Sequence, residues 1–311
     1  MKRKIIMDCD PGHDDAIALI LAGAIDSPLE ILAVTTVAGN QSVDKNTTNA
    51  LNVLDIMGRQ DIAVAKGADR PLIKPAAFAS EIHGESGLDG PKLPSTPSRQ
   101  AVAMPASDVI INKVMTSDTP VTIVATGPLT NVATALIREP RIAEHIESIT
   151  LMGGGTFGNW TPTAEFNISV DAEAAKRVFE SGITINVFGL DVTHQVLADD
   201  HVIERFESIN NPVAQFVVEL LQFFKKTYKT HFNMDGGPIH DACTILYLLQ
   251  PELFTMVPVN IDIEHQSPLT YGTMAVDLNH VTGKPANAYF ATAVDVEEVW
   301  NLIDHKLRTY E

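Results

Sequence analysis

Short β-branched runs alternate with helical stretches along most of this chain, and this alternation limits the possible folds more than any other feature. VTIVATG at residues 121–127 is followed by VATALIREP at 132–140, and DAEAAKRVFESG at 171–182 precedes ITINVFG at 183–189. Strands that alternate with helices indicate βαβ crossovers and a mostly parallel sheet. We therefore expect an α/β fold in which one open, mixed sheet carries helices on both faces, as one domain over residues 1–311.

Polar or glycine-rich segments come directly after the apolar runs. They are DCDPGHDD (8–15), AGN (38–40), TGPLTN (126–131), GGG (153–155) and GLDVTH (189–194). In an open parallel sheet, ligands bind outside the carboxyl ends of the strands. Taken singly, Asn40 or Thr126 would be ordinary turn residues, but their shared position predicts that these segments meet at one active site.

The overall charge excludes several classes of partner. The chain has 39 acidic and 22 basic residues, a net charge of −17, and no cluster of lysine and arginine. Nucleic acids and acidic membrane surfaces are therefore poor partners. The apolar run before Asp8 is too short for a signal peptide, and no apolar stretch approaches the length of a membrane span.

The two cysteines, Cys9 and Cys243, provide no disulfide framework, which fits a reducing cytoplasm. We expect both to be buried small residues rather than nucleophiles. The segment at residues 90–105 is rich in proline and serine, and we expect it to be a surface excursion.

The acidic cluster near the N-terminus requires a counter-charge. Asp8, Asp10, Asp14 and Asp15 lie between the strand-like KIIM and the helix-like AIALILA, and no lysine or arginine follows until Lys45. Carboxylates this close together raise one another's pKa. A bound metal cation explains the cluster better than a solvated acidic turn does.

Several familiar motifs do not fit. An EF-hand counted from Asp8 would need glycine where His13 stands and glutamate where Leu19 stands. No P-loop sequence occurs, and the glycines around Gly155 do not form a G-x-G-x-x-G motif. Asp8-x-Asp10 is similar to the start of the haloacid-dehalogenase-type phosphatases, in which the first aspartate is the nucleophile. However, Pro-Gly follows it here.

Two further segments carry candidate site residues. His240 and Asp241 stand at the start of an apolar helix, where Asp241 could be an ordinary helix-terminal acid or a remote metal ligand. Asn159, Glu165 and Asn167 are spaced through a loop-like stretch and offer donors and acceptors suited to a sugar.

Together these motifs resemble the nucleoside hydrolases. The resemblance rests on D-x-D-P-G-x-D-D, AGN, TGPLTN, LMGGG, T-P-x-A-E-F-N and the late His-Asp pair, and GKPAN at residues 283–287 extends it. The segments look closest to the bacterial pyrimidine-preferring ribonucleoside hydrolases. The resemblance implies hydrolysis of the N-glycosidic bond of a small-molecule nucleoside, giving free base and ribose.

The resemblance also implies a set of metal ligands. Asp10, Asp15, Asp241 and the backbone carbonyl of Thr126 would hold one Ca²⁺ per subunit. Asp10 would in addition act as general base towards a calcium-bound water. Oxygen ligands alone suit magnesium as well as calcium, so the choice of calcium comes from the resemblance. Asp8 would have an inward structural role.

The implied substrate contacts involve more of the chain. Asp14 and Asn40 would hold the 2′- and 3′-hydroxyls of the ribose. The other implied contacts to the sugar are Met152 beneath it and Asn159, Glu165 and Asn167 around it.

Activation of the leaving base is less well defined by the sequence. His240 is a candidate general acid, and His83 is a second histidine that could approach the base or be an ordinary core or surface residue. In QFFKKTYKTHF, Tyr228 and His231 could face the base, or the aromatic spacing could be the apolar stripe of a helix. Trp160 could close the mouth of the site.

The sequence leaves other readings open. The enzyme could prefer purines or accept a broad range of nucleosides. A haloacid-dehalogenase-type phosphatase would need an essential Asp8 and would leave Asn159, Glu165 and Asn167 without a role. A non-catalytic calcium-binding or nucleoside-binding protein is the third possibility. A homotetramer is expected from analogy with the family alone.

Overall fold

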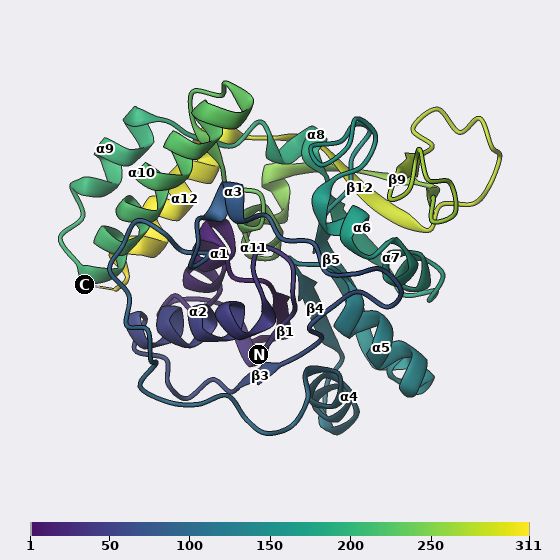
Figure 1. The fold of residues 1–311 in the computed structure, drawn as a ribbon, viewed down its shortest axis with the longest axis horizontal. Coiled ribbons are helices and arrows are strands. Elements are labelled where there is room, and N and C mark those ends of the chain that lie inside the picture. Colours follow the sequence, from purple (N-terminus) through teal and green to yellow (C-terminus); the bar gives the residue numbers. More distant parts are fainter. Residues whose placement is uncertain (1, 311) are drawn as a thin grey trace.

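Eight strands form one sheet in the computed structural model, which describes residues 2–310 (Figure 1). The strands lie in the order β3 (Val64–Lys66), β2 (Leu29–Thr36), β1 (Arg3–Cys9), β4 (Val121–Ala125), β5 (Ile146–Met152), β6 (Ile185–Phe188), β12 (Ala288–Val294) and β9 (Phe254–Val259). All neighbouring pairs are parallel except β12 and β9, which are antiparallel. The predicted mixed α/β sheet is therefore confirmed.

Helices follow most of these strands. The α-helices are α1 (His13–Ala22), α2 (Val43–Ile56), α3 (Ser80–His83), α4 (Ala106–Thr116), α5 (Thr130–Arg138), α6 (Phe166–Val170), α7 (Ala172–Phe179), α8 (Leu190–Thr193), α9 (Asp200–Glu207), α10 (Pro212–Phe232), α11 (Ala242–Leu249) and α12 (Val296–Arg308). Two 3₁₀ helices, η1 (Pro140–Glu144) and η2 (Pro251–Leu253), precede β5 and β9.

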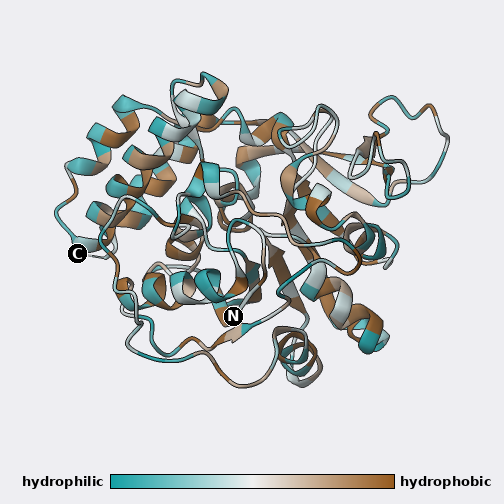
Figure 2. Cartoon of the chain, in the orientation of Figure 1, coloured by the Kyte–Doolittle hydropathy of each residue, from teal (hydrophilic) through white to brown (hydrophobic). Residues whose placement is uncertain are grey.

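Alternation along the strands divides the core between the two faces of the sheet. In β1, Ile5 and Met7 belong to an apolar cluster with α1, α2 and α9 to α12, whereas Ile6 belongs to a second cluster with α4, α5 and α7. Successive side chains of a strand point to opposite faces, so each face needs its own layer of helices. Figure 2 shows the strands as largely hydrophobic and the outward faces of α9 and α10 as hydrophilic.

The parallel strands bring their carboxyl ends to one edge of the sheet. Asp8 pairs in register with Thr35 on β2 and with Ala125 on β4. The polar segments that follow β1, β2 and β4 therefore begin beside one another. This register explains why residues more than 100 positions apart in the sequence meet in the site described below.

Some details differ from the sequence-based expectations or extend them. α7 ends at Phe179 rather than at Gly182, which adopts a φ of +79° beyond the helix. Residues 90–105 form no helix and are largely exposed, as expected for a surface excursion. Both cysteines are buried and unpaired. Among residues 2–310, no helix combines the length and the apolar character that crossing a membrane requires.

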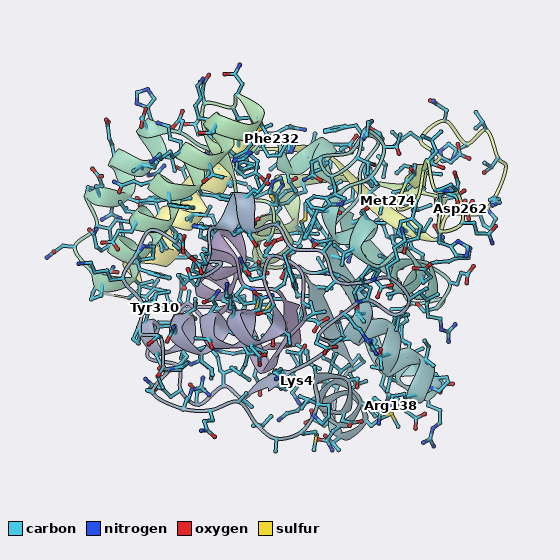
Figure 3. All side chains as sticks on the ribbon, viewed as in Figure 1. Lys4, Arg138, Phe232, Asp262, Met274 and Tyr310 are labelled. Atoms are coloured by element: carbon cyan, nitrogen blue, oxygen red, sulfur yellow. The ribbon has the colours of Figure 1, made fainter. Side chains whose placement is uncertain are left out.

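Two small antiparallel pairs accompany the main sheet. β10 (Ile261–Ile263) and β11 (Met274–Val276) form a ribbon at one end of the molecule, where Figure 3 labels Asp262 and Met274. β7 (Leu197–Ala198) pairs with β8 (Gly237–Pro238) and anchors the segment that enters α11.

Truncation of a core side chain should measure how much the packing of the sheet contributes to stability. Phe290 on β12 is fully buried, so Phe290→Ala should lower the free energy of unfolding by about 3–5 kcal/mol, measured by urea denaturation. Val281→Ala is the control, because Val281 is 83% exposed and its truncation should change the free energy by less than about 0.5 kcal/mol. Equal effects of the two substitutions would contradict this account of the core.

Candidate active site

Asp10 lies at the end of β1, in a cradle that only glycines permit. Its Oδ2 accepts a hydrogen bond of 2.7 Å from the backbone N–H of Asn40. A Cβ at Gly39 would lie 2.1 Å from that Oδ2, and one at Gly127 would lie 2.6 Å from Oδ1. The glycines of AGN and TGPLTN are therefore required so that two loops can approach the Asp10 carboxylate closely. Its Oδ1 is buried and has no hydrogen-bond partner among the described residues.

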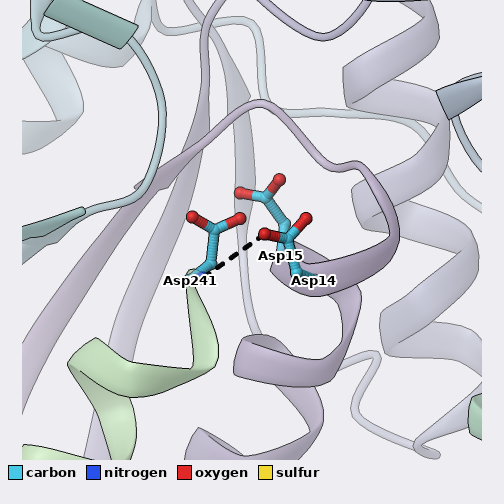
Figure 4. Close-up of side chains that lie close together, drawn as sticks. All are labelled: Asp14, Asp15 and Asp241. Atoms are coloured by element: carbon cyan, nitrogen blue, oxygen red, sulfur yellow. Dashed lines mark hydrogen bonds between the residues drawn. The ribbon is translucent and has the colours of Figure 1, made fainter. Parts of the chain in front are cut away.

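Three more aspartates meet beside it. Oxygen atoms of Asp14 and Asp15, in the first turn of α1, and of Asp241, the N-cap of α11, all lie within 4.8 Å of one another (Figure 4). The backbone N–H of Asp241 lies 3.4 Å from Asp14 Oδ2. Asp15 accepts hydrogen bonds from Thr126 Oγ1 at 2.7 Å and from the backbone N–H of Gly12 at 2.9 Å.

Burial sets the electrostatics of this cluster. It raises the pKa of Asp14 to about 7 and the pKa of Asp10 and Asp241 well above the usual range, and repulsion from Asp15 adds to all three shifts. Burial also raises the pKa of Asp15. None of the ion pairs formed within residues 2–310 includes these four carboxylates. Such a cluster has the charge and oxygen donors that a hard divalent cation requires.

The predicted sugar residues stand on the neighbouring loops. Glu165 is the N-cap of α6 and accepts backbone N–H groups from Gly154 at 2.8 Å and Asn167 at 2.9 Å. Its burial raises its pKa to about 7. The amide of Asn167 donates to the Thr126 carbonyl at 2.8 Å and to the Met152 carbonyl at 3.2 Å. These side chains are thus fixed by the backbone before any ligand arrives.

Asp14, Asp241, Glu165 and the amides border one cavity at the carboxyl edge of the sheet, which is about 540 Å³ with its open mouth included. Most of the predicted site residues line it: Asp14, Asn40, His83, Thr126, Met152, Asn159, Trp160, Glu165, Asn167, Tyr228, His240 and Asp241. Asp10 and Asp15 are fully buried and do not border it. His231 is exposed and is also absent from the lining, although it lies one residue before Phe232, which is present.

Aromatic side chains of α10 form one wall of the cavity. Tyr228 lies in the last two turns of α10, and its hydroxyl is 2.8 Å from His240 Nε2. His240 Nδ1 is 2.7 Å from Thr193 Oγ1, so both ring nitrogens have a hydroxyl partner. Burial holds the pKa of His240 well below its ordinary value, which favours the neutral imidazole. The segment QFFKKTYKTHF is therefore part of a helix, and of Tyr228 and His231 only Tyr228 lines the cavity.

His13 and His83 contact each other beside α10, the helix that forms this wall. His83 lines the cavity, and its Nδ1 lies 3.2 Å from Nδ1 of His13, whose Nε2 is 2.8 Å from the Asp89 carbonyl. The His13 ring stacks at centroid distances of 5.1 Å on both Phe223 and Phe224.

Sequence reasoning assigned no role to several residues that the structure brings to the site. They are His13, Ala79, Ile82, Phe166 and Thr193. Thr193 stands in GLDVTH, one of the strand-end segments, so its position could have indicated it. Ala79 and Ile82 arrive on an irregular segment and α3, and no pattern in the sequence marks them.

The fold and the site together define an α/β protein with a cation-suited carboxylate cluster and a sugar-suited cavity. Comparison with known families makes this description specific. The family model for inosine-uridine preferring nucleoside hydrolase matches residues 5–301. The chain belongs to this family of metal-dependent hydrolases, and it is a ribonucleoside N-ribohydrolase.

Relatives and solved structures agree with this assignment. The pyrimidine-specific ribonucleoside hydrolase RihA of Shewanella sp. (strain ANA-3) is 51% identical over 312 residues, which cover 100% of this chain and 98% of the relative. RihA of Enterobacter sp. (strain 638) is 46% identical, with 100% and 99% covered. The structure of a purine-preferring ribonucleoside hydrolase from Gardnerella vaginalis is similar with a TM-score of 0.91, 30% identity and 99% of both chains covered.

A divalent cation should stabilise the protein more at high pH than at low pH. In the metal-free folded state the pKa of Asp14 is about 7, above its unfolded value, so this group favours folding less as the pH rises towards 7. Protons also compete with the cation at low pH. After chelator treatment, added Ca²⁺ should therefore raise the Tm more at pH 8 than at pH 5.

Two substitutions make this measurement specific. Asp15→Asn should remove most of the Ca²⁺-dependent rise in Tm. Asp44→Asn replaces an exposed aspartate that pairs with Lys66 on the surface and should leave the rise unchanged. An equal rise at both pH values, or an unaltered rise in Asp15→Asn, would contradict the assignment of the cluster.

Proposed function

We propose that this chain hydrolyses the N-glycosidic bond of pyrimidine ribonucleosides, so that nucleoside and water give free base and ribose. The observation that carries the proposal is the set of buried carboxylates, with one unpartnered oxygen on Asp10, beside a cavity lined by fixed polar groups and an aromatic wall. The names of the RihA relatives support pyrimidine preference.

We propose that Asp10, Asp15, Asp241 and the carbonyl of Thr126 hold one Ca²⁺ per subunit. Oxygen atoms of Asp15 and Asp241 lie within 4.8 Å of each other and of Asp14, which supports a site at these two residues. Asp10 and the Thr126 carbonyl are added to the set because both offer oxygen beside Asp15, and the buried cluster has no cationic partner among the described residues. When bound, the ion would supply Lewis acidity that lowers the pKa of a water and would bind the hydroxyls of a ribose.

The protein's own residues account for the remaining chemistry. Asp10 is held through Oδ2 by the Asn40 N–H, so its unpartnered Oδ1 is the atom that can accept a proton from the attacking water. Asp14 and Asn40 line the cavity and hold the 2′- and 3′-hydroxyls. The surrounding carboxylates stabilise the positive charge that develops on the ribosyl ring as the bond to the base breaks.

We propose that His240 assists departure of the base. Thr193 and Tyr228 bond its two ring nitrogens, so a proton can pass from His240 through the Tyr228 hydroxyl to the departing base, and the proton that Asp10 takes from the attacking water restores the balance at the end of the cycle. Tyr228 and Met152 line the cavity as parts of its wall and floor, and His83 can contact the base. Asn159, Glu165 and Asn167 orient the sugar.

The alternative functions have less support. A phosphatase would use Asp8 as nucleophile, yet Asp8 does not line the cavity, and its Oδ1 accepts hydrogen bonds from Thr35 and Asn131. These contacts support the proposal that Asp8 has a structural role. A preference for purines remains a second candidate, because the similar structure from Gardnerella vaginalis carries that description. One domain, a homotetramer and a cytoplasmic location complete the proposal.

Ribose release is the direct test of the proposed activity. Uridine, cytidine, inosine and adenosine should be compared with and without a chelator, and release should be fastest from the two pyrimidine nucleosides and should be lost with the chelator. Fastest release from inosine would overturn the pyrimidine preference alone. No release from any nucleoside, with calcium still bound, would favour a binding protein.

Substitution of the proposed base tests the role of Asp10. Asp10→Asn keeps the shape of the side chain but removes its ability to take a proton, so kcat for uridine should fall by about 10²–10⁴-fold. The circular dichroism spectrum should remain that of the folded protein. Asp44→Asn is the matched control and should retain full activity, since Asp44 is exposed. A fully active Asp10→Asn would exclude this role.

Removing the Tyr228 hydroxyl tests activation of the leaving group. Tyr228→Phe breaks the 2.8 Å contact with His240 and should lower kcat for uridine by about 10²-fold. A p-nitrophenyl riboside needs no proton on its leaving group, so its hydrolysis should change far less. A similar loss with both substrates would show that Tyr228 acts by packing rather than through proton transfer.

A further inference from the structure

A second cavity lies beside the first, and Trp160 borders both. The second cavity is about 790 Å³ with its open mouth included, and its lining combines apolar side chains, among them Ala77, Val170 and Leu269, with the polar side chains of Lys74, Thr161 and Ser169. The segment that lines it at residues 74–77 continues to Ala79, which lines the first cavity. The two cavities therefore share Trp160 and are also connected by the segment at residues 74–79.

The partition between the cavities is thin. The Trp160 ring packs edge-on against Phe166, with centroids 5.0 Å apart and an interplanar angle of 70°. Ala79, Phe166 and Val170 form one small apolar cluster. Ala79 and Phe166 line the first cavity, and Val170 lines the second. Trp160 itself is 47% exposed, so few other side chains hold it in place.

The part of the substrate that faces this partition follows from the proposed function, on which this inference rests. Asp14 and Asn40 are assigned to the 2′- and 3′-hydroxyls, and the wall containing Tyr228 is assigned to the base. The only hydroxyl of a ribonucleoside sugar that remains is the 5′-hydroxyl. Asn159 and Glu165, two of the residues proposed to orient the sugar, line the cavity next to Trp160, and we assign them to this hydroxyl.

We propose that Trp160 determines specificity at C5′: it closes the sugar cavity to substituents there, and the second cavity is the space that a small apolar 5′-substituent would enter without it. The chemistry of the junction favours an apolar group over a phosphate. Lys74 lies over the Tyr271 ring, 2.9 Å from its centroid, and the Tyr271 hydroxyl donates to Glu173. The Glu165 carboxylate and the aspartate cluster would repel an anion.

The test compares kcat/KM for three substrates: uridine, 5′-deoxy-5′-methylthiouridine and uridine 5′-monophosphate. Relative to uridine, the methylthio compound should be a poor substrate of the wild-type enzyme, and Trp160→Ala should raise its relative kcat/KM by about tenfold or more. Trp160→Phe keeps most of the wall and should give a smaller rise. The phosphate should remain a poor substrate throughout. Because each value is a ratio within one preparation, partial misfolding of a variant does not alter it.

A second substitution that fills the second cavity tests whether the 5′-substituent enters that cavity. Ala77→Phe in the Trp160→Ala background fills that cavity and should restore the selectivity of the wild-type enzyme. A ratio that stays within about twofold in Trp160→Ala, or a gain for the phosphate instead, would overturn the inference while uridine hydrolysis still supported the proposed function. A wild-type protein that releases no ribose from uridine would overturn the proposed function and this inference together.

Discussion

Mutual repulsion among four buried aspartates is the constraint around which this molecule is arranged. Asp10, Asp14, Asp15 and Asp241 lie together without a lysine or arginine partner among the described residues, and burial raises the pKa of each. The fold limits the cost with backbone N–H groups, the Thr126 hydroxyl and two glycines that leave room for the carboxylate of Asp10. In the proposed function a bound cation neutralises the remaining negative charge of the aspartates, so stability and activity would depend on the same atoms.

The parallel sheet supplies the rigidity that such a cluster needs. Asp10 follows β1, Asn40 follows β2 and Thr126 follows β4, so the register of three adjacent strands fixes their separation. Asp241 comes from the start of α11, which packs against α1. Because each backbone segment leaves a buried strand or enters a buried helix, little freedom remains for the carboxylates to move apart.

Features with a strong period or a distinctive spacing were predictable from the sequence. The alternation of strands and helices gave the α/β class, and the strand-end segments identified the edge of the sheet where the cavity lies. Helix phase was not predictable: near the end of α10, Tyr228 and Phe232 line the cavity, whereas His231 is turned out to solvent. His83 was a candidate from the sequence and lines the cavity, but its contact with His13 was not predictable, since it joins residues 70 positions apart through an irregular segment. Tertiary packing decides such details.

The separation of the base wall from the rest of the site has an evolutionary consequence. The wall stands on the last turns of α10, while the carboxylates and sugar residues stand on loops and helix starts at the ends of the strands and on α11. Exchanging side chains on this helical end, apart from Tyr228 with its contact to His240, leaves the sheet and the aspartate cluster untouched. In the proposed function, substitutions on this end of α10 would therefore alter which nucleobase is accepted without rebuilding the carboxylate centre. A purine-preferring enzyme with a TM-score of 0.91 to this chain fits this arrangement.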